Sequence, residues 1–271
     1  MAQDLRLHWP LAALRGALPG VDVQAVAAVG STNTELLERL KQGHGGPALL
    51  VAEAQLQGRG RSGRRWQSEP GRSLTFSVAL PLAPADWSGL SLAVGAVLAD
   101  AIEPLADGAS PRLQLKWPND LWLADGGARW RKLGGILIET VAVGAQRACV
   151  VGVGLNVKPL DGTPELSSGY AGVAELDAAL DATALLLRVA APLVQALMRF
   201  ERQGLAPFLA GFERRDLLRG RAVACMGSPS LQGQAAGIDE QGLLLLHTPA
   251  GLQRVASGEV SVRPLAAALE G

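Results

Sequence analysis

The chain has 271 residues and a mass of 28.1 kDa, enough for one large domain and one small one. Hydrophobic residues make up 48% of it and charged residues 18%, so the composition supports a substantial buried core. Lysine plus arginine equals aspartate plus glutamate at 25 each, which argues against a nucleic-acid-binding protein, because such a domain carries a basic excess.

The first part of the chain shows one helical pattern and two strand patterns. Residues 31–40 predict a helix, because their leucines form an apolar stripe. Thr32 and Glu35 stand at capping-box spacing at its start. The apolar runs 48–52 and 73–80 predict buried strands on either side of a loop rich in glycine and arginine.

The middle of the chain predicts three further helices and several strands. Helical patterns cover 88–105, 183–203 and 205–216, and strand patterns cover 113–116, 121–123, 135–141 and 148–157. The last two strands are separated by Gly144, which predicts a hairpin. Together these elements predict an α+β domain over residues 1–217, with a mixed β-sheet flanked by helices.

Residues 218–271 differ from the rest of the chain in their pattern of predicted secondary structure. Short β runs cover 221–226, 232–238, 243–247 and 252–257, and Asp239-Glu240-Gln241-Gly242 supplies a turn. We therefore predict a second, small β-barrel domain over this segment.

The cysteines and histidines give no sign of a metal or disulfide framework. Cys149 and Cys225 sit in apolar, strand-like runs, which predicts reduced, buried thiols in a cytoplasmic protein. His8, His44 and His247 are scattered, so we expect no His/Cys metal site. The N-terminus lacks the basic and apolar stretches of a signal peptide, and no apolar run approaches the roughly 18 residues of a membrane span.

The segment Gly58–Arg65 contains three glycines and four arginines, and the glycines match the spacing of the dinucleotide-binding pattern. The context does not fit that fold, because a strand rather than a helix follows and no acidic residue stands about 20 residues on. The glycines let backbone amides approach a ligand, and the arginines are permanent cations. We predict an anion-binding active-site loop; the alternative is a solvated surface turn with incidental arginines.

The cost of ordering this loop predicts how it behaves. Fixing the backbone costs about 1–2 kcal/mol per residue. A hydrogen bond from arginine to a phosphate or carboxylate returns about 1.5–3 kcal/mol. We therefore expect the loop to be mobile when empty and ordered over an anionic ligand.

The pentapeptide Lys116-Trp117-Pro118-Asn119-Asp120 comes at the end of a predicted strand. Pro118 fixes the backbone there, and Lys116 is a compact cation carried by a rigid element. By itself the pentapeptide also fits an ordinary strand end with an exposed lysine. Together with the loop it is far more specific.

Six segments of the chain, in this order and spacing, resemble the biotin protein ligases. They are Ser31-Thr32-Asn33, Glu53-Ala54-Gln55, Gly58 to Trp66, Lys116 to Asp120, Arg131 to Glu139, and Gly152 to Val157. The resemblance is strong over about residues 28–160, and the β-rich tail resembles the family's C-terminal domain more weakly. It implies the class II synthetase-like catalytic fold of biotin and lipoate ligases, with a small SH3-like C-terminal barrel.

The resemblance implies a two-step reaction with biotin as substrate, ATP and Mg²⁺, and no tightly bound prosthetic group. Biotin and ATP form biotinyl-5′-AMP and pyrophosphate, and the biotinyl group then passes to a lysine of a biotin carboxyl carrier protein of acetyl-CoA carboxylase. Elementary chemistry agrees with this. A carboxylate that attacks a phosphate needs preorganised cations, and the mixed anhydride needs a loop that excludes water.

Carried over by motif, the biotin site is a set of polar, cationic and glycine residues. It comprises Ser31, Thr32, Asn33, Gln55, Arg59, Gly60, Arg61, Lys116, Gly134 and Gly135. Within this set, Ser31 to Asn33 would hydrogen-bond the ureido ring, although they also fit a helix cap. Gln55 also fits a polar strand end, and the two glycines also fit a plain bulge.

The resemblance assigns catalysis to Lys116 and Arg61, with Lys116 contacting the biotin carboxylate and the α-phosphate. The nucleotide residues are Arg61, Arg64, Trp66, Asn119, Lys132 and Asn156, with Asp120 as a magnesium ligand beside ATP. Trp66 would pack on adenine but also fits a core tryptophan. Asn119 and Asp120 also fit a structural turn. Lys132 also fits a lysine that is simply exposed to solvent. Gly152 and Gly154 would leave room for the ligand beside Asn156.

Some members of this family carry an N-terminal winged helix and repress transcription. About 28 residues precede the first motif here, too few for that module. With zero net charge as well, we do not expect nucleic-acid binding, and without a long apolar run we do not expect membrane binding. The sequence leaves open whether the chain forms a homodimer. The enzymatic rival is a lipoate-protein ligase or octanoyl transferase of the same fold, and the rival of another class is a non-catalytic regulator that binds biotinyl-adenylate or DNA.

Overall fold

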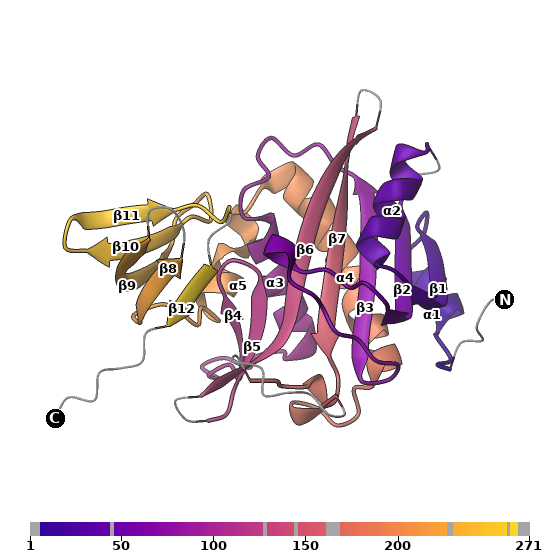
Figure 1. Cartoon of the computed structure of the whole chain (residues 1–271), viewed down its shortest axis with the longest axis horizontal. Coiled ribbons are helices and arrows are strands. Elements are labelled where there is room, and N and C mark those ends of the chain that lie inside the picture. The colour runs from indigo at the N-terminus through magenta and orange to yellow at the C-terminus, as the bar shows by residue number, and fades with distance from the viewer. Residues whose placement is uncertain are drawn as a thin grey trace.

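The computed structural model describes residues 6–43, 46–126, 129–143, 146–160, 169–226, 230–258 and 261–264. The described strands form a seven-stranded sheet and a five-stranded sheet. Figure 1 shows the smaller sheet beside the larger one, at the C-terminal end of the chain.

The larger sheet is mixed, as the sequence predicts. Its strands are β1 (Asp22–Val29), β2 (Ala48–Gln55), β3 (Ser73–Pro81), β4 (Leu113–Lys116), β5 (Asp120–Ala124), β6 (Trp130–Val143) and β7 (Gln146–Asn156). They lie in the order β1-β2-β3-β7-β6-β5-β4, where β1 and β2 are parallel and the other neighbours antiparallel. The predicted pairing of the last two strands is confirmed, but the turn at Gly144 lies outside the described residues.

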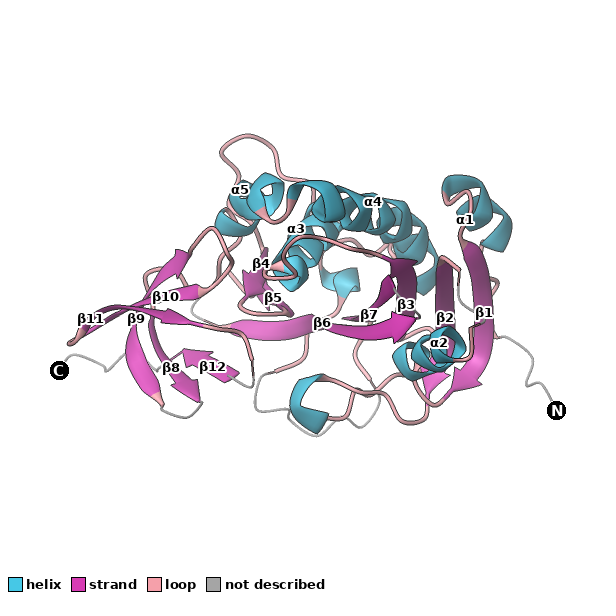
Figure 2. Ribbon diagram, turned by 90° about the horizontal axis from the view of Figure 1, so that it is seen from above, coloured by secondary structure: helices cyan, strands magenta, loops and turns pink. Residues whose placement is uncertain are grey.

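Helices cover both faces of this sheet (Figure 2). One face carries α1 (Leu11–Ala17), α3 (Leu90–Ile102), α4 (Ala182–Gln203) and α5 (Leu209–Glu213), and the other carries α2 (Thr32–Lys41). Short 3₁₀ turns are η1 (Arg61–Gly63), η2 (Val173–Glu175) and η3 (Ala206–Phe208). Helix α4 has the length and hydropathy of a membrane span, but half of its apolar window is buried against the rest of the molecule, as in a core helix.

Strand β3 shows why the two faces of the sheet differ. Its residues alternate, so that Leu74, Phe76 and Val78 enter the main core under the helices. Thr75 and Ser77 are buried on the opposite face, on the side of α2. The sheet therefore presents an apolar face to the main core, while the α2 face is polar around Thr75 and Ser77 and apolar where Leu50 and Val150 pack under α2.

The start of α2 differs from the predicted capping box. Ser31 is the N-cap, and its hydroxyl accepts a hydrogen bond from the Thr34 N–H at 3.5 Å. The Thr32 N–H donates instead to the Gln55 side chain, so the Thr32–Glu35 pair does not cap the helix. The prediction was wrong because Gln55, at the end of β2, accepts the hydrogen bond that a capping box assigns to Glu35. The spacing of residues within the helix cannot reveal a partner from a distant strand.

Other boundaries also shift. The helix predicted over 88–105 spans Leu90–Ile102, because Gly89 has a φ of 76°. The helix predicted over 205–216 is only η3 followed by α5. Helix α1 and strand β1 were not predicted: the helix is short, and the strand is rich in alanine and weakly alternating.

The smaller sheet contains the predicted β runs and one more strand. Its strands are β8 (Ala222–Met226), β9 (Leu231–Ile238), β10 (Leu244–Thr248), β11 (Gly251–Val255) and β12 (Ser261–Pro264), in the antiparallel order β11-β10-β9-β8-β12. The turn at Asp239–Gly242 is confirmed, and β12 is the strand that the sequence did not predict.

Candidate active site

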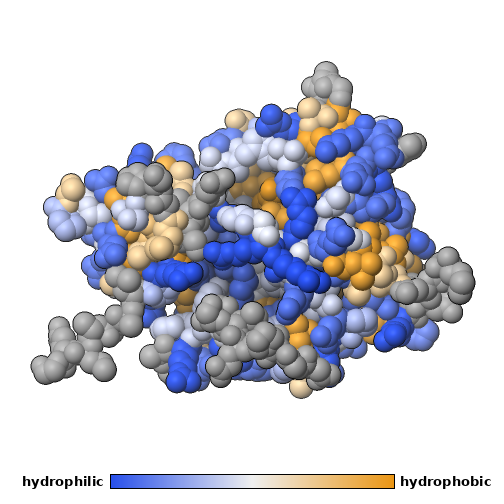
Figure 3. All heavy atoms as spheres, in the orientation of Figure 1, coloured by the Kyte–Doolittle hydropathy of each residue, from blue (hydrophilic) through white to orange (hydrophobic). Residues whose placement is uncertain are grey.

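A cavity of about 600 Å³ opens on the α2 face of the larger sheet. Its lining comes from the start of α2, the glycine-arginine loop, the Lys116 motif, the glycine-bearing parts of β6 and β7, and β12. Figure 3 shows a band of strongly hydrophilic residues across the middle of this face. The segments that the sequence analysis singled out therefore meet in one place.

One end of the cavity is a pocket of uncharged polar side chains. The Gln55 side-chain oxygen accepts hydrogen bonds from the Thr32 N–H at 2.8 Å and from the Thr32 hydroxyl at 3.2 Å. The Thr32 and Ser77 hydroxyls are 2.7 Å apart, and Ser77 donates to Asn33 Oδ1 at 2.6 Å. Asn33 Nδ2 donates in turn to the Leu137 carbonyl at 3.1 Å. This network fixes amide and hydroxyl groups from α2, β2 and β3.

The glycine-arginine loop is a small hairpin over this pocket. Its ladder consists of Trp66 N–H to the Gly58 carbonyl at 2.9 Å and Gly60 N–H to the Arg64 carbonyl at 2.7 Å. At the tip, Ser62 has a φ of 53°, which is uncommon for a residue with a side chain. The expectation that the loop is mobile when empty stays a prediction.

The loop arginines have different surroundings. Arg59 is half exposed and pairs with Glu139 at 3.4 Å. Arg61 donates to Asn119 Oδ1 at 3.1 Å and to the carbonyls of Ser257 and Gly258 in the small domain. Burial lowers the pKa of the Arg61 guanidinium, and the Asp120 carboxylate opposes that shift. Arg61 therefore connects the loop, the lysine motif and the segment between β11 and β12 of the smaller sheet.

Lys116 lies at the end of β4, half-buried in the cavity wall. Within the described part of the chain its Nζ has no hydrogen-bond partner and lies 5.1 Å from the centre of the Trp122 ring. Burial lowers the pKa of Lys116; Asp120 opposes this shift, while Lys132, Arg64 and Arg263 add to it. A desolvated ammonium without a fixed partner is suited to bind an incoming anion.

Asp120 is the only carboxylate among the described residues that line the cavity. Its Oδ1 accepts a hydrogen bond from Lys132 Nζ at 2.7 Å. No cluster of three His, Cys, Asp or Glu residues occurs in the described part of the chain. One paired carboxylate fits a magnesium ion that is held mainly by substrate phosphates, as Mg²⁺ usually is.

The Trp66 ring packs against the glycine-bearing strands and lines the cavity. A Cβ on Gly154 would come within 2.5 Å of the Trp66 ring, and one on Gly135 within 3.6 Å. Lys132 Nζ lies 5.8 Å from the ring centre. The sequence left open an adenine contact or a core position for this tryptophan, and the ring is part of the cavity wall.

The remaining predicted residues of β6 and β7 separate into two groups. Gly135, Gly152, Gly154 and Asn156 line the cavity, but Gly134 is not among its lining residues. Gly134 sits at the β5–β6 irregularity, where a Cβ would clash with Leu155 at 2.6 Å. Its need for glycine therefore comes from strand packing, as in the bulge alternative. Asn156 donates to the Lys132 carbonyl at 3.1 Å.

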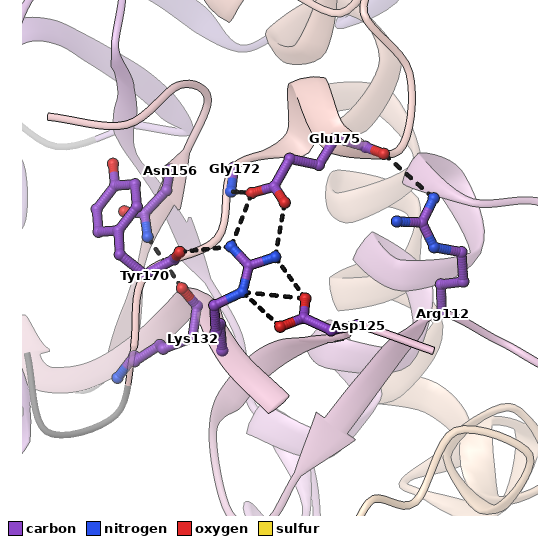
Figure 4. Close-up of polar contacts among 8 residues, drawn as sticks. Arg112, Asp125, Lys132, Asn156, Tyr170, Gly172 and Glu175 are labelled. Atoms are coloured by element: carbon purple, nitrogen blue, oxygen red, sulfur yellow. Dashed lines mark hydrogen bonds and ion pairs between the residues drawn. The ribbon is translucent and has the colours of Figure 1, made fainter. Parts of the chain in front are cut away.

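A cluster of charged groups borders the cavity next to Lys132 (Figure 4). Arg131, the adjacent residue on β6, pairs with Asp125 at 2.5 Å and with Glu175 at 2.6 Å. It also donates to the Tyr170 carbonyl at 2.7 Å, and Glu175 accepts from the Gly172 N–H at 2.9 Å. Tyr170 lines the cavity, and the cluster holds the segment that contains it in place.

Sequence reasoning did not identify Ser77, Tyr170 and Arg263, all of which contribute to this region. A signal existed for Ser77, because Ser73, Thr75 and Ser77 alternate within an otherwise apolar run. Tyr170 and Arg263 stand in no recognisable motif. Their proximity to the site depends on how distant segments fold together.

Comparison with known proteins defines the class to which this fold and site belong. The model of the Biotin/lipoate A/B protein ligase family matches residues 26–156, and that of the Biotin protein ligase C terminal domain matches residues 220–263. Among the solved structures, the biotin protein ligase from Aquifex aeolicus in complex with biotin and ATP has a TM-score of 0.74 and 28% identity. That alignment covers 90% of this chain and 99% of the other.

Curated relatives narrow the class. The bifunctional ligase/repressor BirA of Escherichia coli is 36% identical over 92% of this chain and 76% of its own length. The biotin–[acetyl-CoA-carboxylase] ligase of Mycobacterium tuberculosis is 35% identical over 88% of both chains, and that of Paracoccus denitrificans is 33% identical over 87% of this chain and 98% of its own. The chain therefore belongs to the biotin protein ligase family, and the expectation of a ligase enzyme is confirmed.

Proposed function

We propose that the enzyme activates biotin with ATP to biotinyl-5′-AMP and transfers the biotinyl group to a lysine of the biotin carboxyl carrier protein of acetyl-CoA carboxylase. The observation that carries this proposal is the pairing, in one cavity, of a neutral amide and hydroxyl pocket with the half-buried ammonium of Lys116, which has no hydrogen-bond partner among the described residues. Two relatives, aligned over 88% and 98% of their own lengths, carry the name of this acceptor enzyme.

The neutral pocket matches the head of biotin. A ureido ring offers two N–H donors and one carbonyl acceptor, and it needs both acceptors and donors around it. Thr32, Asn33 and Gln55 provide both kinds of group within the hydrogen-bond network. An octanoyl or lipoyl chain has no such polar head, so this pocket favours biotin over the lipoate alternative.

The cations suit the first chemical step. A biotin carboxylate oxygen attacks the α-phosphorus of ATP, the bond to the β-phosphate oxygen breaks, and pyrophosphate leaves. The attack brings two anions together, so fixed positive charge lowers the barrier. Lys116 would contact both the carboxylate and the α-phosphate, and Arg61 would bind the phosphate from the loop above.

The nucleotide end of the cavity would use Asn119, Asp120, Lys132 and Asn156, with Trp66 and Arg64 beside them. Asp120 would hold magnesium jointly with the nucleotide phosphates. A bound magnesium ion neutralises the charge of the phosphates and of the leaving pyrophosphate. The existing Asp120–Lys132 ion pair then exchanges partners when the nucleotide binds.

In the second step the acceptor lysine attacks the carbonyl carbon of the mixed anhydride, and AMP leaves with the bridging oxygen. The loop hairpin would exclude water from the anhydride until that lysine arrives. We expect a ligase without repressor activity, because the charge of the chain is balanced. We also expect cytoplasmic location, because both cysteines are free and buried.

The direct test is transfer of biotin to a purified carrier domain, read by intact-mass spectrometry. We expect one biotinyl adduct that requires both ATP and Mg²⁺ and that is lost when the acceptor lysine is replaced by arginine. Lipoate and octanoate serve as competing substrates in parallel reactions. An adduct with either acid in preference to biotin would overturn the proposal.

A further inference from the structure

The C-terminal domain contacts the catalytic motif at Trp117, the residue after Lys116. The Trp117 ring is only 1% exposed, and its indole N–H donates to the Gly242 carbonyl at 3.0 Å inside the protein. Gly242 belongs to the turn between β9 and β10. The two residues are 125 positions apart in the sequence, and their hydrogen bond crosses from one sheet to the other.

The turn that carries this carbonyl is held rigidly. The Asp239 side chain accepts hydrogen bonds from the N–H groups of Gln241 at 3.0 Å and Leu243 at 2.9 Å. Gly242 has a φ of 78°, and a Cβ there would lie 3.0 Å from Gly89 Cα at the start of α3. The turn is therefore packed so closely against the start of α3 that a side chain at Gly242 would fit only if its neighbours moved.

The motif is fixed from α3 as well. The Ser91 hydroxyl of α3 donates to the Pro118 carbonyl at 2.8 Å, one residue beyond Trp117. Lys116 itself ends β4, which pairs with β5 through Asp120. The backbone that orients Lys116 is thus held by its own sheet on one side and by α3 and the C-terminal turn on the other.

The partial burial of Lys116 also involves the C-terminal domain. Arg263 and Val262 of β12 line the same cavity, so the smaller sheet closes one side of it. Burial is the main cause that lowers the pKa of Lys116. The charged groups that face it are Asp120, Lys132, Arg64 and Arg263. A looser C-terminal domain would admit water next to the ammonium.

We infer that Trp117 and Gly242 form a positioning pair, through which docking of the C-terminal domain sets the place of Lys116 and keeps its ammonium partly shielded from water. Neither residue need touch the reacting atoms. The inference rests on the proposed role of Lys116 in adenylation. It makes the C-terminal domain part of the catalytic alignment rather than a separate module attached to the enzyme.

The test uses two substitutions in the full-length enzyme. Trp117→Phe keeps an aromatic ring but removes the N–H donor. Gly242→Ala adds a methyl group where it would press on Gly89 and Leu92. The matched control is Gly220→Ala, because Gly220 has a φ of 77° and open space around its Cβ position. The control therefore carries the same backbone strain without the contact between domains.

We expect both test variants to lower kcat for biotin-dependent pyrophosphate release about tenfold. The KM values for biotin and ATP should change less than about twofold, because misplacing a catalytic group acts on the transition state. The control should keep the wild-type kcat. Melting temperatures of all three variants identify any that fold poorly, and Gly242→Ala carries the test if Trp117→Phe is one of them.

The pH profile separates positioning from a purely structural role. The ammonium form of Lys116 is the active one, so activity falls as pH rises through its pKa. Water beside Lys116 removes part of the desolvation and raises that pKa, so the alkaline limb should move to higher pH in both test variants and not in Gly220→Ala. A variant that only lowers stability leaves the alkaline limb of the pH–activity profile in place.

The outcomes also separate this inference from the proposed function. If the wild-type enzyme releases no pyrophosphate with biotin, the proposed function fails. If the wild type is active while Gly242→Ala matches Gly220→Ala in both kcat and alkaline limb, only the inference is overturned.

Discussion

A side chain at Gly152 and the side chain of Asn33 would occupy the same space: a Cβ built on Gly152 would lie 2.2 Å from Asn33 Oδ1. That oxygen accepts the hydrogen bond from Ser77 at 2.6 Å. Gly152 lies on β7 and Asn33 on the first turn of α2. The missing side chain in the sheet is what lets the start of the helix complete the polar pocket.

The first prediction follows from this contact. Gly152→Ala should displace Asn33 and break its bonds to Ser77 and the Leu137 carbonyl. Two lost hydrogen bonds of about 1 kcal/mol each should raise the Kd for biotin at least tenfold, with ATP binding little changed. Calorimetric titration with each ligand measures this. Gly46→Ala, in open space, is the control, and equal biotin affinity in the two variants would contradict the assignment.

The second prediction concerns Lys116. Lys116→Ala should lower the rate of biotinyl-adenylate formation by a factor of about 10²–10³, because it removes a cation preorganised for the developing charge. Pyrophosphate release under saturating biotin and ATP is the measurement. Lys41→Ala removes an exposed lysine at the end of α2 and should leave the rate unchanged. Near-normal adenylate formation in Lys116→Ala would take this lysine out of the catalytic group.

Three residues that the resemblance assigned to the site stand at the ends of strands. Gln55 ends β2, Lys116 ends β4 and Asn156 ends β7. The apolar patterning predicted the strands. The roles of the polar residues at their ends came from the resemblance and stay predictions. The same logic located the α+β mixed sheet and the β-rich tail.

Local patterning could not predict contacts between distant segments. Arg61 and Gly258 are 197 residues apart, and no periodicity links them. Glu35 was assigned to a capping box because the spacing fits, whereas the Thr32 N–H bonds to Gln55 across the sheet. Gly134 was grouped with the biotin-binding residues because it adjoins Gly135. On β6, neighbouring residues point to opposite faces, and only Gly135 lines the cavity.

The third prediction concerns Arg61, which joins the loop to Asn119 and to the carbonyls of the small domain. Arg61→Gly should release biotinyl-adenylate, because charge-assisted hydrogen bonds of about 1.5–3 kcal/mol each are lost and escape rises at least tenfold. Biotin incorporated into serum albumin in the presence of ATP reports the released adenylate. Arg65→Gly adds the same flexibility elsewhere in the loop and should release little. If both variants label albumin equally, Arg61 does not retain the intermediate.

The fourth prediction concerns the Arg131 cluster (Figure 4). Arg131→Gln should loosen the segment at Tyr170 and raise the KM for ATP about threefold to tenfold, with the KM for biotin unchanged, because only the nucleotide end is affected. Arg188→Gln, which removes an ion pair on α4, is the control. Because these side chains are partly exposed, high salt should raise the KM of the wild type towards that of the variant.

The pH dependence of this cluster has a definite sign. Hydrogen bonds from Arg131 are the main cause that lowers the pKa of Asp125 and of Glu175. A lowered carboxyl pKa contributes stabilisation that is present above the unfolded-state pKa and is lost as pH falls through the folded-state pKa. The KM for ATP should therefore rise below about pH 4 in the wild type and less so in Arg131→Gln. If the KM for ATP rises equally at low pH in the wild type and in Arg131→Gln, the cluster does not have this role.

The fifth prediction is one of stability. Arg215 is 1% exposed and donates to Asp100 at 3.0 Å, to Glu103 at 2.9 Å and to the Leu113 carbonyl at 2.9 Å. These contacts tie α3 to the strand that ends at Lys116. Arg215→Met leaves the acids without their buried partner and should lower the free energy of unfolding by about 3 kcal/mol.

Urea unfolding measures this loss, and the adjacent arginine supplies the control. Arg214 is exposed, and its distance to Asp100 is 4.0 Å, so Arg214→Met should change the free energy of unfolding by less than about 0.5 kcal/mol. Equal losses in the two variants would mean that the buried arginine adds nothing beyond a surface ion pair. A large loss for Arg215→Met alone makes the α3–β4 junction the structural support of the catalytic strand, which Ser91 and the C-terminal turn then align at its far end.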